Sequence, residues 1–530
     1  MRILVFHGYL LGGTGSNVYN ARLAAALTRA GHDVHLLCQE RHPEDHAFVD
    51  AAGDWDEGSL NVRELDRPRP DGARGRCTTY RPDIGGLLPV YVADRYEGIE
   101  ARTFADCSEQ EIDRYIEANV AAVREVSELV RPELALANHA IMGPVVLARA
   151  LGGQVPYAVK VHGSALEYAV KPHPERFLEP AREGLAGAVA VLVGSHHTAS
   201  SLWEAIGDSG LIERTRLGPP GVEVEDFIPR EPASAAAGLK ALVPRLQANA
   251  EASRPDSSTA ASAFDRDEAV AAAAIARLDP EHDRLVAYVG KLIVSKGVDL
   301  LLACWPLVLA RVPSARLVVV GFGAYRQGLE QLLEALAEGD LGEARQIAMA
   351  GRALEDETVP AVPMRHLLAF LGSLEGQELE TYLEAARTLR ERVVLTGRLD
   401  HEELTELLPA CEALVAPSTF PEAFGMVAAE AAACGVLPVV ANHSGLAEVA
   451  GALSLAVPQE AAGWLSFDVG DGSVGDLASC LTGWLTAGGE LRSSTRAGLV
   501  RTVRERWSWD GVAAGVIAAA RGELDLLQKP

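Results

Sequence analysis

Short apolar runs of strand length recur along the chain in two groups, and this recurrence constrains the fold more than any other feature. The first group is Arg2–Phe6, Asp33–Cys38, Leu134–Ala137, Tyr157–Val161 and Ala188–Val193; the second is Leu285–Val289, Arg316–Val320, Val393–Leu395, Ala413–Ala416 and Leu437–Val440. Segments with helical patterns separate the runs within each group. Such alternation is typical of parallel sheets covered by helices. The sequence therefore predicts an α/β protein built from two similar units.

These groups also set the expected domain boundaries, because a chain of 530 residues exceeds one ordinary core. We expect an N-terminal Rossmann-like domain over 1–225 and a second over 284–505. An alanine-rich linker or helical insertion is expected between them at 226–283. Leucines and alanines at helical spacing predict a further helical insertion at about 328–392. Residues 506–530 contain an alanine-rich helix that we expect to return to the N-terminal domain.

Charge and composition restrict the partners of the chain. The formal net charge of −25 and the pI of about 5.0 disfavour nucleic acid, whose phosphates such a surface repels. The seven cysteines are dispersed, which favours a reducing compartment. No apolar run approaches the length of a membrane span, and the N-terminus is better interpreted as a strand than as a signal peptide. We therefore expect a cytoplasmic protein, and a peripheral position at the inner face of the membrane stays open.

Two glutamates separated by seven residues form the most informative motif. Glu422 follows a strand in a loop with proline and glycine, and Glu430 lies in the alanine-rich helix that comes next. Eight residues make slightly over two helical turns, so both carboxylates can face one cleft and accept hydrogen bonds from sugar hydroxyls. A solitary glutamate would more often be a solvated surface charge; a second one among alanines indicates a partner. Anions are stabilised at a helix N-terminus, here by the amides of Phe424, Gly425, Met426 and Val427.

Two lysines follow the first strand of the second group. Lys291 and Lys296 are five residues apart, between the strand end and the next helix. Alone they would be ordinary surface lysines. At the carboxyl end of a parallel sheet, and together with the glutamate pair, they suit a pyrophosphate whose charge they would neutralise as it leaves.

These two stretches resemble family 4 of the retaining glycosyltransferases, which have the GT-B fold of two Rossmann-like domains with parallel sheets facing a central cleft. The resemblance implies transfer of a sugar from a nucleotide-diphosphate sugar to an acceptor with retention of configuration. It implies no metal and no cofactor, because the nucleotide sugar is a substrate. Consistently, no Asp-x-Asp motif follows an expected strand.

The resemblance also assigns roles to residues in the second domain. Glu422 would contact the transferred sugar and Glu430 the ribose, while Lys291 and Lys296 would contact the pyrophosphate. Lysine at 291 replaces the usual arginine of the family and lacks its bidentate fork. Gly397 would lie near the nucleotide base. Lys296 and Glu422 are the expected catalytic residues of this domain.

In the first domain the resemblance extends to a glycine-rich loop and two histidines. Gly12 and Gly13 match the start of the family's loop near the β-phosphate, so Gly13 is expected to contact the donor. Asn17 begins an Asn-Val-Tyr sequence similar to that of the inositol-phosphate and sucrose-phosphate branch. His139 and His162 follow strands where the family places histidines. His139 is expected to be catalytic, and Asn17, His139 and His162 to face the acceptor: a sugar, a sugar phosphate or a lipid-linked sugar. A homodimer is possible.

Two alternatives remain at this point. One is another nucleotide-sugar enzyme of the same fold, such as an epimerase. The other is an NAD(P)-dependent oxidoreductase, suggested by Gly13-x-Gly15 after the first strand and by Glu40 after the second. A dinucleotide-binding loop should begin almost at the strand end, whereas five residues separate Phe6 from Gly12.

Overall fold

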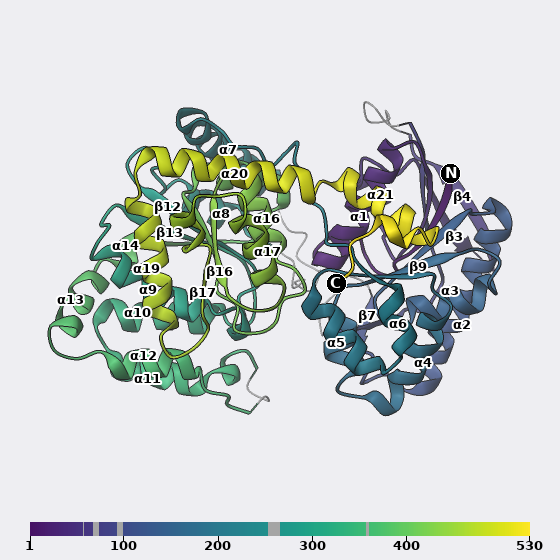
Figure 1. The fold of residues 1–530 in the computed structure, drawn as a ribbon, viewed down its shortest axis with the longest axis horizontal. Coiled ribbons are helices and arrows are strands. Elements are labelled where there is room, and N and C mark those ends of the chain that lie inside the picture. Colours follow the sequence, from purple (N-terminus) through teal and green to yellow (C-terminus); the bar gives the residue numbers. More distant parts are fainter. Residues whose placement is uncertain (57, 67–73, 93–98, 253–265, 357–359) are drawn as a thin grey trace. The chain divides into compact units, whose positions relative to one another are not determined.

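The structure, a computed structural model, describes residues 1–56, 58–66, 74–92, 99–252, 266–356 and 360–530. The chain divides into two compact units (Figure 1). Unit 1 contains Met1–Gly221 together with Trp507–Pro530, and unit 2 contains Val222–Arg506. Unit 1 is therefore assembled from two parts of the chain that are far apart in sequence.

A nine-stranded sheet in the order β11-β10-β9-β8-β1-β2-β5-β3-β4 forms the centre of unit 1. Neighbouring strands are parallel except for the antiparallel pair β3 and β4. The strands are β1 Arg2–Phe6, β2 Asp33–Leu37, β3 Ala51–Asp56, β4 Ser59–Glu64, β5 Cys77–Arg81, β8 Leu134–Asn138, β9 Tyr157–Val161, β10 Ala190–Val193 and β11 Thr215–Leu217. A small parallel pair, β6 (Leu87–Val90) and β7 (Glu100–Thr103), stands apart.

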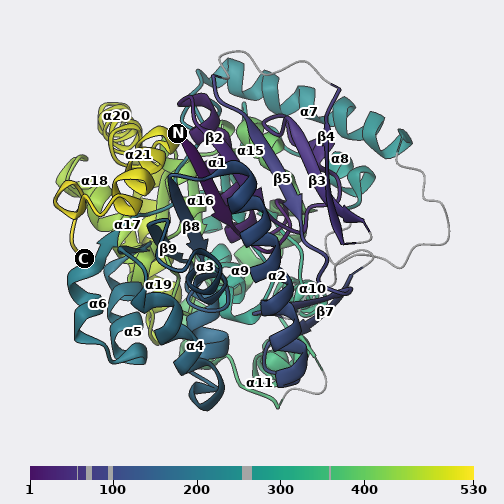
Figure 2. The same ribbon diagram turned by 90° about the vertical axis from the view of Figure 1, so that its right-hand side faces the viewer.

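Helices cover both faces of this sheet, which explains why its central strands are apolar throughout. Ile3 and Val5 of β1 belong to one core cluster, whereas Leu4 and Phe6 belong to the other, as alternation along a strand requires. The first cluster contains residues of α1 and α21, which lie side by side (Figure 2). The second contains residues of α2 to α6. The helices are α1 Gly15–Arg29, α2 Glu109–Val130, α3 Gly143–Leu151, α4 Pro174–Ala186, α5 His196–Ile206, α6 Ser209–Arg214 and α21 Trp509–Ala520.

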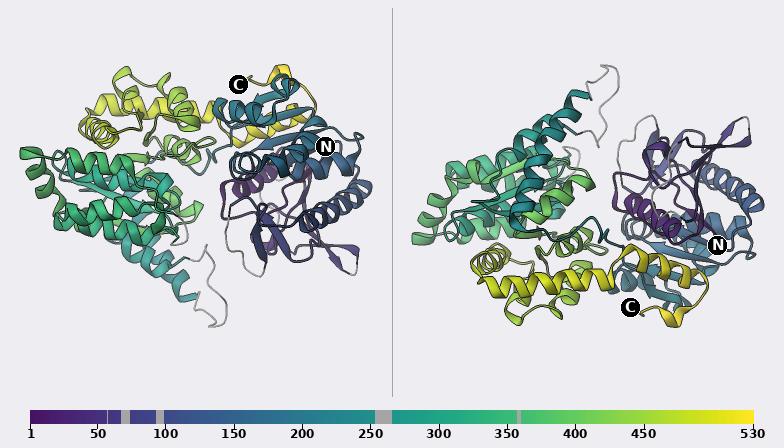
Figure 3. Two further views of the ribbon diagram at one scale, coloured as in Figure 1. Left: turned by 90° about the horizontal axis from the view of Figure 1, so that it is seen from below. Right: turned by 90° about the horizontal axis from the view of Figure 1, so that it is seen from above.

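Unit 2 is built on a six-stranded parallel sheet in the order β14-β13-β12-β15-β16-β17. Helices lie on both of its faces (Figures 1 and 3). The strands are β12 Arg284–Val289, β13 Ala315–Val320, β14 Val393–Gly397, β15 Ala413–Ala416, β16 Leu437–Ala441 and β17 Ser466–Phe467. The helices outside the two segments discussed next are α9 Val298–Leu309, α15 His401–Leu407, α16 Met426–Ala433, α17 Ser444–Ser454, α18 Gln459–Ala462, α19 Ser473–Thr486 and α20 Gly489–Arg506.

The segment expected as an alanine-rich linker or helical insertion at 226–283 is helical in most of its described part. It forms α7 (Pro232–Ala252) and α8 (Glu268–Ile275), which pack against each other, and α8 also packs on β14. Leu239, Leu242 and Leu246 of α7 are buried. These helices therefore belong to unit 2 instead of connecting two domains, because their apolar faces need a partner. Residues 253–265 of this segment lie outside the described residues.

The second expected insertion, about 328–392, contains several helices besides the one that directly follows β13. The crossover helix α10 (Arg326–Glu338) follows β13, and four more precede β14: α11 Leu341–Ala350, α12 Arg365–Ser373, α13 Gly376–Ala386 and α14 Leu389–Arg392. Both α12 and α13 pack on α9, and the buried Tyr382 hydroxyl donates to the Ala303 carbonyl at 3.0 Å. Across the described parts of the chain, every helix is too short or too polar to traverse a bilayer.

Candidate active site

Each sheet contains a place where the strand order reverses, and most of the candidate residues follow the strands that meet there. In unit 2 these strands are β12 and β15; the chain continues from β12 to β13 on one side and from β15 to β16 on the other. In unit 1 they are β1 and β8, which continue to β2 and β9. Right-handed crossovers then place the following helices on opposite faces and leave a crevice at the carboxyl ends of the strands. Ligands of open α/β sheets bind at such crevices.

The loops after β12 and β15 are joined by main-chain contacts. The Thr419 amide donates to the Ser295 carbonyl at 2.9 Å, and the Ser418 hydroxyl donates to the same oxygen at 3.2 Å. Gly297 has a φ of +69°, and a Cβ there would lie 2.0 Å from the Pro417 carbonyl oxygen. Glycine is therefore required at 297 both by its conformation and by this close approach.

This junction brings Lys296 and Glu422 together. The ammonium group of Lys296 forms an ion pair with the Glu422 carboxylate, and the two side chains are 31% and 25% exposed. Partial exposure leaves both groups accessible to a ligand. The pair therefore presents one positive and one negative group at the crevice between β12 and β15.

A third loop, after β16, fixes the backbone around Glu422. The Glu422 amide donates to the Ser444 hydroxyl at 2.9 Å, and its carbonyl accepts from the Gly445 amide at 2.9 Å. His443 donates through Nε2 to the Ser418 carbonyl at 2.8 Å. A Cβ at Gly445 would lie 2.6 Å from the Phe424 Cα atom, so this contact leaves no room for a side chain.

Glu430 lies in α16 and is buried at 5% exposure. One of its carboxylate oxygens is 3.9 Å from Nδ1 of His401 at the start of α15. Gly425 begins α16 with a φ of +123°, and Phe424 before it is buried. The first-turn amides of a helix, here those of Met426 and Val427 among others, have no partner within the helix and can serve an anion.

Lys291 follows β12 itself, whereas Gly397 ends β14, which lies beyond β13 in the sheet. The Lys291 carbonyl accepts from the Tyr288 hydroxyl at 2.8 Å, which holds the turn after β12. Gly397 ends β14 with a φ of +75°, and its carbonyl accepts from the Gly321 amide at 2.9 Å. All the unit 2 candidates therefore lie at the carboxyl end of one sheet. In the contacts described above, Lys296 and Glu422 are the two candidates that pair directly.

In unit 1 a buried hydrogen-bond network connects the ends of β1, α1, β8 and β9. His7 Nε2 lies 3.1 Å from Oδ1 of Asn17 and 3.0 Å from the Leu10 carbonyl. The side-chain amide of Asn17 also donates to the Gly12 carbonyl at 2.7 Å, and this bond connects the glycine-rich loop to α1. Gly13, the next residue, has a φ of +91° that suits glycine.

The same network assigns the tautomers of two histidines. Because both neighbours of His7 Nε2 are acceptors, this nitrogen carries the proton, and Nδ1 accepts from the Asn20 amide at 3.0 Å. Asn20 and Asn138 exchange two hydrogen bonds of 2.8 and 3.1 Å. His162 Nε2 donates to Asn138 Oδ1 at 2.8 Å. The His162 proton is therefore on Nε2.

His139 differs from its neighbours because neither ring nitrogen has a hydrogen-bond partner among the described residues. The residue is 2% exposed and has a φ of +69°, a strained conformation for a side chain other than glycine. Its ring lies 4.9 Å from that of His162 and 4.6 Å from that of Tyr91, measured between centroids. A strained, buried imidazole with no hydrogen-bond partner in the described chain is typical of a ligand-facing residue.

Burial keeps these histidines neutral. Desolvation lowers the pKa of His7 to about 4, against the hydrogen bonds to Asn17 and Leu10 that raise it. Desolvation also lowers the pKa of His139 and of His162 well below the usual value, and the neighbouring His7 adds to this effect. At neutral pH these imidazoles of unit 1 are therefore uncharged, and they can act through hydrogen bonds but not as cations.

The sequence reasoning missed several residues that hold these sites. They are His7 and Asn20 in unit 1, and His443, Ser444 and Gly445 in unit 2. The available signal was the same one that identified His139: a polar residue directly after an apolar strand. His7 follows β1 at this position, and His443 lies two residues after the end of β16.

Family models match two parts of the chain. Residues 14–218 match the model described as glycosyl transferase 4-like domain, and residues 363–464 match the one described as glycosyl transferases group 1. Together the matched ranges span more than half of the chain. Among curated proteins, an uncharacterized glycosyltransferase of Methanocaldococcus jannaschii is 23% identical over 47% of this chain and 47% of its own length. The D-inositol 3-phosphate glycosyltransferase of Segniliparus rotundus is 29% identical over 47% of this chain and 41% of its own. The chain thus matches less than half the length of these relatives.

Solved structures resemble the chain over nearly its whole length. Sucrose-phosphate synthase from Thermosynechococcus elongatus has a TM-score of 0.57 at 19% identity, covering 99% of both chains. HepE of Anabaena, solved in complex with UDP and glucose, has a TM-score of 0.53 at 15% identity, covering 98% of this chain and 99% of its own. At these identities the likeness concerns the fold.

Proposed function

This chain belongs to the group 1 glycosyltransferases and has their GT-B fold, and from that premise we propose that it transfers a sugar from a nucleotide-diphosphate sugar to a hydroxyl-bearing acceptor. The acceptor is a sugar, a sugar phosphate or a lipid-linked sugar. The alternatives of an oxidoreductase or an epimerase are not favoured, because both matched family models describe glycosyltransferases.

One observation carries the proposal: Lys296 and Glu422 form an ion pair at the crevice between β12 and β15. A departing nucleoside diphosphate needs positive charge, which Lys296 supplies with the help of Lys291 and the N-terminus of α16. The transferred sugar has hydroxyl groups that Glu422 can accept hydrogen bonds from. Glu430, which lies in α16, would bind the ribose of the donor, and Gly397 would lie near its base.

The proposed reaction retains configuration without a protein nucleophile. The bond from the anomeric carbon to the β-phosphate oxygen breaks, and the acceptor oxygen bonds to the same face of that carbon. The acceptor proton passes to the leaving phosphate oxygen. His139 is neutral, so a ring nitrogen can accept a hydrogen bond from a sugar hydroxyl and orient it. The His162 ring lies beside it, with centroids 4.9 Å apart, and Asn17 is held by its hydrogen bond to His7.

Lysines and helix amides provide the positive charge in this proposal, so catalysis needs no divalent ion. Treatment with EDTA should leave the initial rate unchanged, and added Mg²⁺ or Mn²⁺ should restore nothing. A rate that falls with EDTA and recovers with a metal would contradict this part. The anomeric configuration of the product, read from the proton coupling constant by NMR, tests retention.

Thermal unfolding with a panel of UDP-glucose, GDP-mannose and ADP-glucose tests donor binding. A donor present at about 100 times its Kd stabilises the protein by roughly 2.7 kcal/mol, so at least one should raise Tm clearly. The Lys296→Met variant should lose most of this increase. Lys240→Met is the matched control, because Lys240 lies on α7 with its side chain 60% exposed. Equal increases in all three proteins, or none with any donor, would refute the assigned site.

A further inference from the structure

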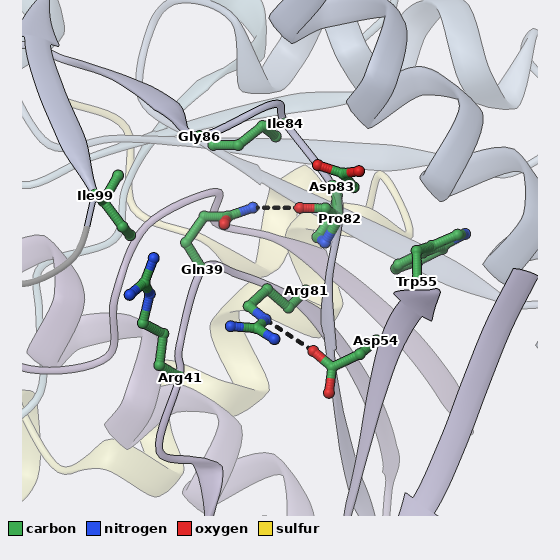
Figure 4. Close-up of a pocket in the computed structure, with 10 residues that line it drawn as sticks. All are labelled: Gln39, Arg41, Asp54, Trp55, Arg81, Pro82, Asp83, Ile84, Gly86 and Ile99. Atoms are coloured by element: carbon green, nitrogen blue, oxygen red, sulfur yellow. Dashed lines mark hydrogen bonds and ion pairs between the residues drawn. The ribbon is translucent and has the colours of Figure 1, made fainter. Parts of the chain in front are cut away.

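A polar cavity opens in unit 1. It has a volume of about 190 Å³ and lies at the ends of β2, β3 and β5 (Figure 4). Gln39 and Arg41 follow β2, Asp54 and Trp55 belong to β3, and Arg81 ends β5. The β3–β4 hairpin extends the sheet beyond β5, so this cavity depends on strands outside the five expected in the first domain.

Hydrogen bonds hold most of the polar side chains around this cavity. Arg81 Nε donates to Asp54 at 2.8 Å, and the Gln39 amide donates to the Pro82 carbonyl at 2.9 Å. The Trp55 indole N–H donates to Glu125 at 2.8 Å. Figure 4 shows the Arg41 and Arg81 guanidinium groups reaching into the same space beside Gln39. A lining fixed in this way is prepared for a ligand and loses little side-chain entropy on binding.

The charges of the lining favour a neutral ligand rich in hydroxyl groups. Arg41 and Arg81 contribute two positive charges, and Asp54 and Asp83 contribute two negative ones. Guanidinium groups donate hydrogen bonds, carboxylates accept them, and the Gln39 carbonyl adds another acceptor. A sugar hydroxyl does both, whereas a phosphate would approach two carboxylates at a cost.

The cavity lies close to His139. The main-chain amide of Gln39 donates to the Tyr9 carbonyl at 2.8 Å. The Tyr9 ring meets the His139 ring edge to face, with centroids 5.5 Å apart. One residue therefore separates the cavity from the imidazole that we propose orients the acceptor hydroxyl.

We infer that this cavity binds a sugar or polyol ring of the acceptor, at a position remote from the hydroxyl that attacks the donor. The inference rests on the proposed function and makes it more specific: the acceptor is a glycoside or oligosaccharide with at least two rings or ring-sized parts. Arg41, Arg81 and Asp54 bind its hydroxyl groups, and the Trp55 indole lines one wall.

Saturation-transfer NMR on the full chain tests this inference with named probes. The neutral probes are the methyl glycosides of glucose, mannose, galactose and N-acetylglucosamine, together with maltose and myo-inositol; glucose 6-phosphate is the anionic probe. At least one neutral probe should receive saturation from the protein. Arg41→Met and Arg81→Met should each weaken its binding about tenfold, the loss typical of one charged hydrogen bond. Arg63→Met, on the exposed strand β4, is the matched control and should bind normally.

Three results would overturn the inference: no binding of any neutral probe, binding that both cavity variants leave intact, or stronger binding of glucose 6-phosphate than of every neutral probe. Donor binding provides the separate readout. If nucleotide sugars still raise Tm in the wild type and in both variants while the probes fail, only the cavity assignment is wrong. If no nucleotide sugar binds, the proposed function itself fails.

Discussion

At the scale of single residues, Glu422 is the side chain on which the donor site depends most directly, because it pairs with Lys296 and its backbone is held on both sides by the loop after β16. Glu422→Gln should lower kcat by about 10²–10³, the range for losing one preorganised electrostatic contact to a transition state. Initial rates with a saturating donor measure this. Glu460→Gln, on the exposed start of α18, is the control. A Glu422→Gln enzyme with normal kcat would remove Glu422 from the mechanism.

His139 is expected to serve the acceptor without stabilising the fold by hydrogen bonds, because neither nitrogen has such a partner in the described residues. His139→Asn keeps a residue that tolerates positive φ. It should lower kcat/KM for the acceptor at least about tenfold, with unchanged donor binding in the thermal-unfolding assay. His42→Ala, with a side chain 66% exposed in the same unit, should leave both unchanged. Loss of donor binding in His139→Asn would instead indicate a general structural role.

At this scale the sequence predicted where the candidate side chains lie better than it predicted their supports. His139 directly follows β8, and Lys296 and Glu422 lie in the loops after β12 and β15, so all three could be expected at the carboxyl ends of strands. The partners Ser444 and Gly445 could not, because they are distant in sequence and act through one hydroxyl and one missing Cβ. Whether all the assigned residues contact ligand stays a prediction.

At the scale of elements, α17 packs against the loop that contains Glu422 and Phe424. A methyl group at Gly445 would lie 2.6 Å from the Phe424 Cα atom. Because this is a main-chain atom, the contact can be relieved only if the loop itself moves. Gly445→Ala should displace the loop and weaken donor binding tenfold or more, since overpacking commonly costs about 1–3 kcal/mol. Thermal shifts across a donor titration measure this.

The same helix contains the control. A Cβ at Gly451 has nothing within 4 Å, so Gly451→Ala should keep donor binding. It should also stabilise the fold slightly, because alanine is the better helix former by about 1 kcal/mol. Equal donor affinities in the two variants would show that α17 does not position the loop.

The central strands of both sheets could be predicted because burial on two faces makes them continuously apolar. The hairpin β3–β4 and strand β5 could not: β4 is largely exposed, and β3 and β5 contain charged residues. In the segment expected as an alanine-rich linker or helical insertion, the packing of the helices could not be predicted for a related reason. Alanine-rich helices give weak amphipathic patterns, yet α7 buries Leu239, Leu242 and Leu246 against unit 2.

At the scale of the whole molecule, the buried histidines of unit 1 couple stability to pH. The pKa of His7 is lowered to about 4 in the fold, and those of His139 and His162 are lowered well below 6.5, so the unfolded chain binds more protons between these values. Stability should therefore be complete above about pH 6.5 and fall as pH drops toward 4. The slope is about 1.4 kcal/mol per pH unit for each such proton.

Urea unfolding at pH 7 and pH 5 measures this loss. His7→Asn, which removes one of the rings whose pKa the fold lowers, should show a smaller difference between the two pH values than the wild type. His282→Asn, with an exposed ring in unit 2, should match the wild type. An equal loss in His7→Asn and the wild type would mean that other groups govern the acid response.

Unit 1 is completed by residues from the far end of the chain, and this has a consequence for biosynthesis. Strand β1 leaves the ribosome before α21, which contributes Trp509, Ala513 and Val516 to the core shared with α1 and is translated only after the whole of unit 2. At about 10 residues per second, synthesis of unit 2 alone takes on the order of half a minute. During that time α21 does not yet cover Ile3, Val5 and the neighbouring core residues. We therefore expect the nascent N-terminal half to bind a chaperone that recognises apolar surface.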